Sequence, residues 1–395
     1  MCGGGEMDKK VVFFDFANLN YGGGCEKNFM KFGNWLFKKG YDVSFVTGSH
    51  KLNKWLSEVI NSDEYKKNIS DQDLRKVFGV KDYLKFSLVD LFFPTKNRRQ
   101  IKRTLKEADV IVSKNEVFDI IPLKFLFFTS PKKIVFGFHT PLYYPVTRDF
   151  KSKFHNWLYN SFIYHWMIFN SRNRLLVLTY DDKKLLSRAN PKNITVIPNP
   201  LDTKKFYQKE YKMRDKFKVY FIGRMTEQKG VDILYESIIL LSKEKEFENM
   251  EFYFIGSGNQ EHYFIELSNS FENCHFLGFK TDVVKYYHDA DILIAPSRWE
   301  TYCYSVAEAA SCGVPVIASN IPGPNQLIIN NKTGLLIKPN EVNELKQAIF
   351  NLYSLWKNNY KDFVLNGISA RKYIVDNFEE DLINKRVEKF IIQNE

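Results

Sequence analysis

Short apolar segments alternate with longer amphipathic segments along the chain, and this alternation occurs twice. Residues 10–16 (KVVFFDF) and 41–47 (YDVSFVT) have the length and the aromatic and β-branched content of buried strands. Residues 26–39 between them predict a helix, and Gly40 predicts its end. Further strands are predicted at residues 84–89, 108–112, 133–138 and 174–178. Strands separated by helix-length segments are typical of parallel βαβ units.

The same alternation begins again after residues 196–202 (VIPNPLD). Residues 218–223 (KVYFIG) and 251–256 (EFYFIG) predict strands, and residues 231–243 predict a helix. The remaining elements are predicted as strands at residues 274–278, 291–295 and 314–318 and helices at about 304–312 and at 376–393. We therefore predict an α/β protein with Rossmann-like domains at residues 1–200 and 201–375, followed by a helix at residues 376–395. Because ligands of open α/β sheets bind beyond the carboxyl ends of the strands, we expect the domains to face each other across a cleft that holds the site.

Composition and charge narrow the class of protein. The 395 residues are 44% apolar and 26% charged, which excludes a disordered chain. Five cysteines without a CxxC pair favour a reducing, cytoplasmic setting, and we expect no signal peptide and no membrane-spanning segment. Residues 1–200 hold 33 basic and 19 acidic residues, whereas residues 201–395 hold 24 and 27. We expect the basic front half to meet an anionic partner.

Two glycine-containing loops follow predicted strands. Gly22, Gly23 and Gly24 lie between the first strand and the first helix, where glycines let backbone N–H groups approach a phosphate. A plain turn explains them equally well. Arg224, after Gly223, is predicted to end a strand and Lys229 to open the following helix, where two cations can clamp a diphosphate. The alternative is solvated loop charge.

Carboxylates and a histidine also follow strands. Glu300 and Glu308 lie eight residues apart, in a loop and on the following predicted helix, and could accept hydrogen bonds from sugar hydroxyls. They could instead be two surface acids. However, Glu308 lies among small apolar residues, where an acid without a partner is costly. His139 follows a buried-looking strand and is either catalytic or structural.

These elements lie within longer segments that occur in a fixed order. The segments of the back half read VIPNPLDTKKF, FIGRMTEQKG, FIGSGN, FLGF, ADILIAPSRWETYCYSVAEAASCGVPVIAS and NNKTGLLIKP. Together with the glycine loop and His139 they resemble the retaining glycosyltransferases of GT-B fold, family 4. The resemblance covers the chain from Lys10 to the C-terminal helix, and its most specific part is the pair of glutamates with the GVPVIAS continuation.

The resemblance implies a donor site carried mainly by the second domain. Arg224 and Lys229 would bind the diphosphate of a nucleotide sugar, a UDP- or GDP-sugar. Glu300 would contact hydroxyls of the donor sugar, and Glu308 would hold the ribose. The implied donor-binding residues are Gly23, Gly24, Gly223, Arg224, Lys229, Glu300, Tyr302, Cys303, Tyr304 and Glu308, and the implied catalytic residues are His139, Arg224, Lys229 and Glu300.

From the front domain, Gly23 and Gly24 would approach the donor phosphate, and His139 would lie beside the transferred sugar. That domain would bind the acceptor, and the C-terminal helix would cross back onto it. The implied reaction is metal-independent transfer of a hexose-type sugar with retention, without a cofactor and without a protein nucleophile. Where the family often has Gly-Phe-Gly, this chain has Thr301-Tyr302-Cys303, so side chains crowd that turn and the donor sugar stays open.

The acceptor side is basic and aromatic. Cations are predicted on one side of a helix before Val110, at Lys96, Arg99, Lys102, Arg103 and Lys106. Residues 154–169 (FHNWLYNSFIYHWMIF) are dense in aromatics, which suits either an interface or a packed core. Because many family members glycosylate lipids, we expect a glycan or lipid-linked acceptor and an anionic membrane surface as partners. This would place the protein in the cytoplasm, peripheral on the inner face of the cell or ER membrane.

Some of these features also occur in other classes of protein. A nucleic-acid-binding protein would use the basic charge, but no RNP, KH, zinc-finger or helix-turn-helix signature occurs, so no nucleic acid is expected. An epimerase of the same fold fits the two cations and two glutamates less well. A non-catalytic nucleotide-sugar-binding protein remains an alternative.

Overall fold

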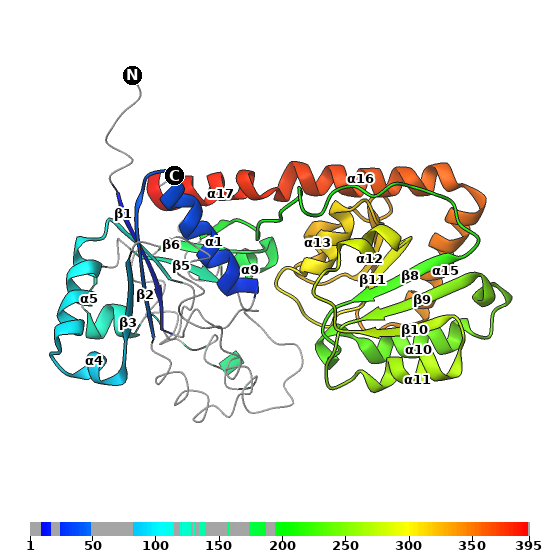
Figure 1. Ribbon diagram of the computed structural model, residues 1–395, viewed down its shortest axis with the longest axis horizontal. Coiled ribbons are helices and arrows are strands. Elements are labelled where there is room, and N and C mark those ends of the chain that lie inside the picture. The colour runs from blue at the N-terminus through cyan, green and yellow to red at the C-terminus, as the bar shows by residue number, and fades with distance from the viewer. Residues whose placement is uncertain are drawn as a thin grey trace, which may run out of the picture. The chain divides into compact units, whose positions relative to one another are not determined.

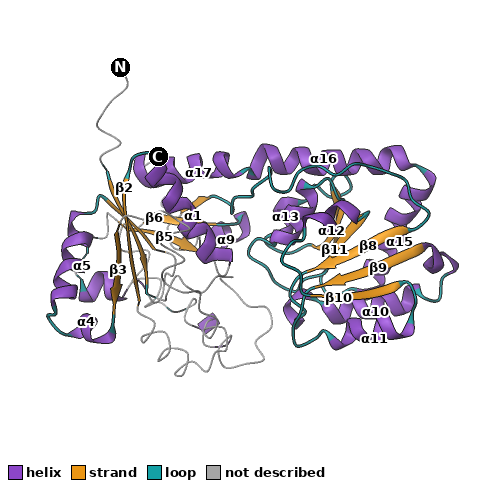
Figure 2. Cartoon of the chain, viewed as in Figure 1, coloured by secondary structure: helices purple, strands orange, loops and turns teal. Residues whose placement is uncertain are grey.

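The computed structural model describes residues 9–16, 24–48, 82–113, 119, 121–127, 129–130, 134–138, 153, 156–157, 161, 174–186 and 194–393 (Figures 1 and 2). The chain forms two compact units, one made of residues 1–198 and 384–395 and the other of residues 199–383. Each unit is built on a fully parallel sheet, so the prediction of two Rossmann-like α/β domains is confirmed.

The sheet of the first unit has the strand order β3-β2-β1-β4-β5-β6-β7 in the described part of the chain. Its strands are β1 (Lys10–Asp15), β2 (Asp42–Gly48), β3 (Asp82–Phe86), β4 (Val110–Ser113), β5 (Ile134–Phe138), β6 (Arg174–Val177) and β7 (Ile194–Val196). The described helices include α1 (Gly24–Lys38), α4 (Leu88–Phe92), α5 (Lys96–Glu107) and α9 (Tyr180–Leu186), with a π-helical turn η3 (Pro122–Leu126). The central strands are apolar on both faces because both faces are covered.

The second unit has the strand order β10-β9-β8-β11-β12-β13. Its strands are β8 (Phe217–Ile222), β9 (Met250–Ile255), β10 (Cys274–Gly278), β11 (Ile292–Ala295), β12 (Val316–Ser319) and β13 (Gly334–Ile337). Its main helices are α10 (Val231–Leu241), α11 (His262–Ser270), α12 (Val284–Asp289), α13 (Tyr304–Ser311), α14 (Pro324–Leu327), α15 (Val342–Asn358) and α16 (Tyr360–Phe378). Figure 1 shows α10 and α11 on one face of the sheet and α12 and α13 on the other, and each face has its own apolar core.

The predicted elements of the sheets match the structure within a few residues. Gly40 ends α1 with a φ of 97°, as predicted, because a residue without Cβ takes this conformation freely. The helix α1 begins at Gly24 rather than at residue 26. Strands β7, of three residues, and β13, of four, were not predicted.

The single helix predicted at residues 376–393 is wrong in one respect. Helix α16 ends at Phe378, Glu379 leaves the helical conformation with a ψ of 140°, and α17 (Glu380–Glu388) begins after it. The break coincides with a backbone contact, since the Phe378 carbonyl accepts a hydrogen bond from the Leu201 N–H at 2.8 Å. A π-helical turn, η8 (Lys389–Gln393), follows α17.

The end of the chain is bound to the first unit by polar contacts. Lys39 forms an ion pair of 2.8 Å with Glu388, and the Tyr41 hydroxyl donates to the same carboxylate at 2.9 Å. The Arg174 guanidinium at the start of β6 donates to the carbonyls of Phe390 and Ile391. Residues 384–395 therefore belong structurally with the first unit although they follow the second in sequence.

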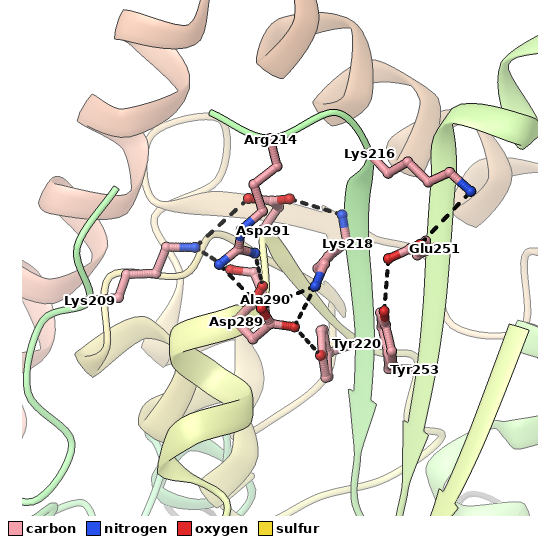
Figure 3. Close-up of polar contacts among 10 residues, drawn as sticks. All are labelled: Lys209, Arg214, Lys216, Lys218, Tyr220, Glu251, Tyr253, Asp289, Ala290 and Asp291. Carbon is pink, nitrogen blue, oxygen red and sulfur yellow. Dashed lines mark hydrogen bonds and ion pairs between the residues drawn. The ribbon is translucent and has the colours of Figure 1, made fainter. Parts of the chain in front are cut away.

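A charged cluster fixes the segment before β8 to the amino-terminal edge of the second sheet (Figure 3). The Asp291 carboxylate accepts a hydrogen bond from the Lys218 N–H at 2.9 Å and lies 3.9 Å from the Lys209 ammonium. Lys209 is buried and also donates to the Ala290 carbonyl. The neighbouring Asp289 carboxylate accepts from Tyr220 at 2.6 Å. The charged groups of this cluster form hydrogen bonds and ion pairs with each other and with the backbone, so the cluster holds this end of the sheet together.

Candidate active site

The candidate donor site lies at the opposite, carboxyl-terminal edge of the second sheet. Strands β8 and β11 are neighbours in the sheet, although β9 and β10 separate them in sequence. The strand order reverses at this point, which is where open α/β sheets bind ligands. The loop at residues 223–230 follows β8, and the loop at residues 296–303 follows β11. Every residue predicted for the donor site of this unit lies in these loops or in α13, which comes next.

Close backbone contact holds the two loops together. Gly230 has a φ of 66°, and a Cβ placed on it would lie 2.1 Å from the Pro296 carbonyl oxygen. Glycine is therefore required where the first loop crosses the second. The sequence predicted that Lys229 opens the helix that is now α10, and this is wrong. Lys229 instead ends a 3₁₀ turn, η6 (Glu227–Lys229), before Gly230. This turn aims the lysine at the loop after β11.

Lys229 and Glu300 form an ion pair across the two loops. Ser297 also donates a hydrogen bond of 3.1 Å to the Glu300 carboxylate. The two charged side chains are only 16% and 9% exposed, so few water molecules screen them. Burial lowers the pKa of Lys229, but the facing Glu300 carboxylate outweighs it and raises the pKa above the usual value. The site thus holds a fixed ammonium ion with a carboxylate beside it.

Arg298, two residues before Glu300, forms further contacts between the two loops. Its guanidinium donates to both carboxylate oxygens of Asp232 at 2.7 and 2.6 Å and to the Glu227 carbonyl at 2.7 Å. Burial acts to raise the pKa of Asp232, but these hydrogen bonds from Arg298 hold the pKa below its usual value. Sequence reasoning missed this pair, because the partners are 66 residues apart and no motif joins them.

Arg224, predicted as a second diphosphate ligand, is exposed at the start of the loop after β8. Its guanidinium donates one hydrogen bond of 3.2 Å to Gln228. The buried side chain of Met225 anchors the loop directly after it. A guanidinium on an anchored loop with its remaining donors at the surface suits the binding of a phosphate oxygen.

The turn after Glu300 is filled by side chains. Tyr302 is 2% exposed, and Cys303 is 4% exposed and begins α13 in a left-handed conformation with a φ of 69°. The Tyr304 ring packs edge-on against Tyr302 with the centroids 4.9 Å apart. Crowding of this turn was expected, and the structure locates it in the interior.

Glu308 has the partner that its apolar surroundings require. The Tyr287 hydroxyl on α12 donates a hydrogen bond of 2.7 Å to the Glu308 carboxylate. Burial raises the pKa of Glu308 to about 7, although Tyr287, Lys205 and Lys229 each act to lower it. The sequence indicated the need for a partner but not its identity, since Tyr287 and Glu308 are 21 residues apart and strand β11 lies between α12 and α13.

The predicted residues of the first unit are only partly described. His139 and Gly23 lie outside the described residues, and Gly24 is the first residue of α1. Within residues 199–383 the structure brings Lys229, Glu300 and Cys303 together, and it places Glu308 one helical turn beyond Tyr304. In the described part of the chain, no three His, Cys, Asp or Glu side chains gather as a metal ion would need.

Comparison with known families identifies the class of protein. A model described as Glycosyltransferase Family 4 matches residues 22–205, and a model described as Glycosyl transferases group 1 matches residues 202–369. The two matches overlap at residues 202–205 and together cover every strand of both sheets except β1. The chain belongs to the family 4 glycosyltransferases, and its two Rossmann-like sheets define the GT-B fold.

Individual proteins that resemble this chain share fewer than a third of the aligned residues with it. The chain is similar to the Escherichia coli UDP-Gal:alpha-D-GlcNAc-diphosphoundecaprenol alpha-1,3-galactosyltransferase, with 29% identity over 58% of this chain and 62% of that relative. An uncharacterised glycosyltransferase of Haemophilus influenzae is 26% identical over 86% of this chain and 89% of its own. The crystal structure of Anabaena HepE in complex with UDP aligns with a TM-score of 0.72 and 17% identity, covering 97% and 99% of the two chains. That likeness shows the fold.

Proposed function

We propose that this protein transfers a hexose-type sugar from a nucleotide diphosphate sugar to a hydroxyl acceptor with retention of the anomeric configuration. The observation that carries the proposal is the ion pair of Lys229 and Glu300 at the carboxyl edge between β8 and β11. An ammonium ion there can neutralise a diphosphate, and the adjacent carboxylate can accept hydrogen bonds from sugar hydroxyls.

The chemistry follows from where charge develops. When the bond from the sugar to the diphosphate breaks, negative charge grows on the leaving phosphate oxygens. Lys229 and Arg224 are already held in place by Glu300 and Gln228, so they stabilise that charge with little reorganisation. In our proposal the acceptor hydroxyl attacks from the face that the leaving group vacates, and a leaving phosphate oxygen takes its proton. No metal ion is part of this proposal.

The remaining residue roles belong to the same proposal. Glu308 holds the ribose, and Tyr287 keeps its carboxylate oriented. Gly23, Gly24 and His139 of the first unit approach the phosphate and the transferred sugar. UDP-hexoses are the first donors to test, because the Escherichia coli relative is named for UDP-Gal and HepE was solved with UDP.

A thermal-shift and donor-hydrolysis screen tests the proposal. UDP-glucose, UDP-galactose, UDP-N-acetylglucosamine and GDP-mannose are each added with EDTA. A ligand that binds only the folded state stabilises it by about 2.7 kcal/mol at a hundredfold excess over Kd. We expect a rise in Tm and slow release of nucleotide with one of these donors. No shift and no hydrolysis with any of them would favour the non-catalytic alternative.

The acceptor is proposed to be lipid-linked, reached at an anionic membrane surface. The Escherichia coli relative is named for an alpha-D-GlcNAc-diphosphoundecaprenol acceptor. In this chain, α5 presents exposed cations at Lys96, Arg99, Lys102, Arg103 and Lys106. The adjacent α4 and its end expose the apolar side chains of Val89, Phe92 and Phe93. Cations beside exposed aromatic rings match the headgroups and acyl boundary of an anionic bilayer.

Arg98 makes this surface rigid. Its guanidinium donates to the carbonyls of Asp90 and Leu91 on α4 and to the Leu126 carbonyl on η3. Helix α4 and turn η3 follow β3 and β4, so they lie at the carboxyl edge of the first sheet, where a ligand of that sheet is expected. None of the helices in the described ranges is long and apolar enough to cross a membrane.

Vesicle sedimentation tests the membrane surface. Vesicles of phosphatidylcholine with and without phosphatidylglycerol are mixed with wild type, with Lys96→Glu/Arg99→Glu and with Phe92→Ser/Phe93→Ser. Each reversed cation loses about 1 kcal/mol of attraction and adds repulsion, so we expect binding to fall more than tenfold. Lys372→Glu, an exposed helical cation of the second unit, is the matched control. Equal binding of all variants would contradict the proposal.

A further inference from the structure

Cys303 has a backbone conformation that a cysteine rarely adopts. Its φ is 69° and its ψ is 79°, in the left-handed region. Among the residues that the structure describes, the other non-glycine residues with positive φ are Asn331 and Asn340, both exposed. Asparagine tolerates this region because its short polar side chain bonds locally, whereas Cβ of most residues meets the following carbonyl oxygen. Cys303 is the buried exception.

The surroundings impose this conformation. The preceding residue, Tyr302, is fixed by burial of its ring against Phe378, with the centroids 6.2 Å apart. Behind the turn, a Cβ on Gly323 would lie 2.9 Å from the Tyr302 nitrogen, so the two backbones are in close contact. After the turn, the Cys303 carbonyl accepts the first helical hydrogen bonds of α13, from Val306 at 3.2 Å and from Ala307. A glycine would take this conformation without steric cost.

The thiol lies near the ion pair of the candidate donor site. It interacts electrostatically with both Lys229 and Glu300, and its Sγ lies 3.6 Å from the Ser305 hydroxyl. Burial raises the pKa of the Cys303 thiol to about 11, so the group is a neutral thiol at pH 7 and not a nucleophile. The thiol can therefore affect the site through its volume, which lies beside the Glu300 carboxylate that is proposed to hold the donor sugar.

We propose that the Cys303 side chain determines donor specificity by filling space beside Glu300 and excluding donor sugars with a bulky substituent there. This inference rests on the proposed function, because it assumes that a sugar occupies the position next to Glu300. Strain retained at one buried residue is typical of functional sites, where the local conformation serves the ligand rather than stability.

The test compares Cys303→Gly, which removes both the strain and the volume, with Cys303→Ala, which keeps Cβ and its strain. Donor hydrolysis is measured with UDP-glucose and UDP-N-acetylglucosamine, and the ratio of their kcat/KM values is the readout. We expect Cys303→Gly to raise the ratio for the N-acetylated sugar about tenfold and Cys303→Ala to raise it less. The affinity of Cys303→Gly for UDP alone should stay within about twofold of that of wild type, since UDP lacks the transferred hexose.

Stability and a matched control separate the possible outcomes. Cys303→Gly should melt about 2–4 °C above Cys303→Ala, because only glycine relieves the left-handed strain. Asn331→Gly changes another left-handed residue, away from the site, and should leave the donor ratio unchanged. A donor ratio in Cys303→Gly equal to that of wild type would overturn the specificity role while the proposed function stands. If wild type neither binds nor hydrolyses any donor, the proposed function fails first and the specificity role fails with it.

Discussion

The Arg298 guanidinium binds the Asp232 carboxylate through two parallel hydrogen bonds, of 2.7 and 2.6 Å, and so joins the loop after β11 to the first turn of α10. The 3₁₀ turn that carries Lys229 directly precedes this first turn, and the carbonyl of its first residue, Glu227, also accepts a hydrogen bond from Arg298. The Arg298 N–H also donates to the Gln228 carbonyl at 2.8 Å, and the Gln228 side chain donates to the Trp299 carbonyl. The ammonium proposed to bind diphosphate is therefore placed by its neighbours on both sides.

Arg298→Lys should weaken UDP binding about three- to tenfold, because an ammonium ion cannot reproduce the two-pronged contact and the turn carrying Lys229 loosens. The measurement is titration calorimetry well below the Tm of each variant. Lys209→Ala serves as control, since it destabilises the same unit at the opposite edge. If folded Lys209→Ala lost as much UDP affinity, Arg298 would have no positioning role beyond stability.

Glu308→Gln should alter the dependence of stability on pH. Because the pKa of the Glu308 carboxyl is about 7 in the folded protein against its ordinary value of 4.5, the folded state binds the extra proton between these values. The free energy of unfolding of wild type relative to Glu308→Gln should fall by about 2–3 kcal/mol as pH rises from 5 to 8. Urea unfolding at several pH values measures it, and parallel curves for the two proteins would contradict a raised pKa.

The affinity for UDP should also depend on the protonation of Glu308, but it should rise with pH where the free energy of unfolding falls. A carboxylate accepts ribose hydrogen bonds at both oxygens, whereas the protonated group loses an acceptor. We expect the UDP affinity of wild type to increase as pH rises through about 7, and that of Glu308→Gln to change little over this range. A pH profile shared by both proteins would assign the titration to another group.

Lys209→Ala should cost about 3–5 kcal/mol of unfolding free energy, because it leaves the buried Asp291 carboxylate without its cation. Lys216→Ala removes a cation at the same 3.9 Å from a carboxylate, that of Glu251, but its side chain is 47% exposed. This control should cost less than about 1 kcal/mol. Figure 3 shows both lysines, and urea unfolding distinguishes them. Equal costs would mean that burial does not decide the strength of these pairs.

Most strands of both sheets were predictable because strands buried on two faces are short, continuous apolar runs, as in KVVFFDF and EFYFIG. Glu308 could be identified because an acid among alanines needs a partner. The identity of that partner, Tyr287, depends on how α12 packs against α13, which no local pattern encodes.

Contacts across the sheet were harder to predict. Lys229 and Glu300 are 71 residues apart and meet only because β8 and β11 are adjacent. The left-handed conformation of Cys303 was also not predictable, since it arises from the burial of Tyr302 and the close approach of Gly323. The break at Glu379 coincides with a backbone contact to Leu201, which is distant in sequence. Each of these features is a tertiary effect.

Titration calorimetry of UDP and UDP-glucose into wild type, Lys229→Ala and Glu300→Gln tests the central claim most directly. We expect Lys229→Ala to lose about 10–100-fold in affinity for UDP, the worth of a charge-assisted contact. Glu300→Gln should keep its UDP affinity and lose the extra affinity that the glucose supplies. Lys346→Ala, which breaks an ion pair between α15 and Glu244, should bind both ligands as wild type does. Wild-type affinity for UDP in Lys229→Ala would contradict the account.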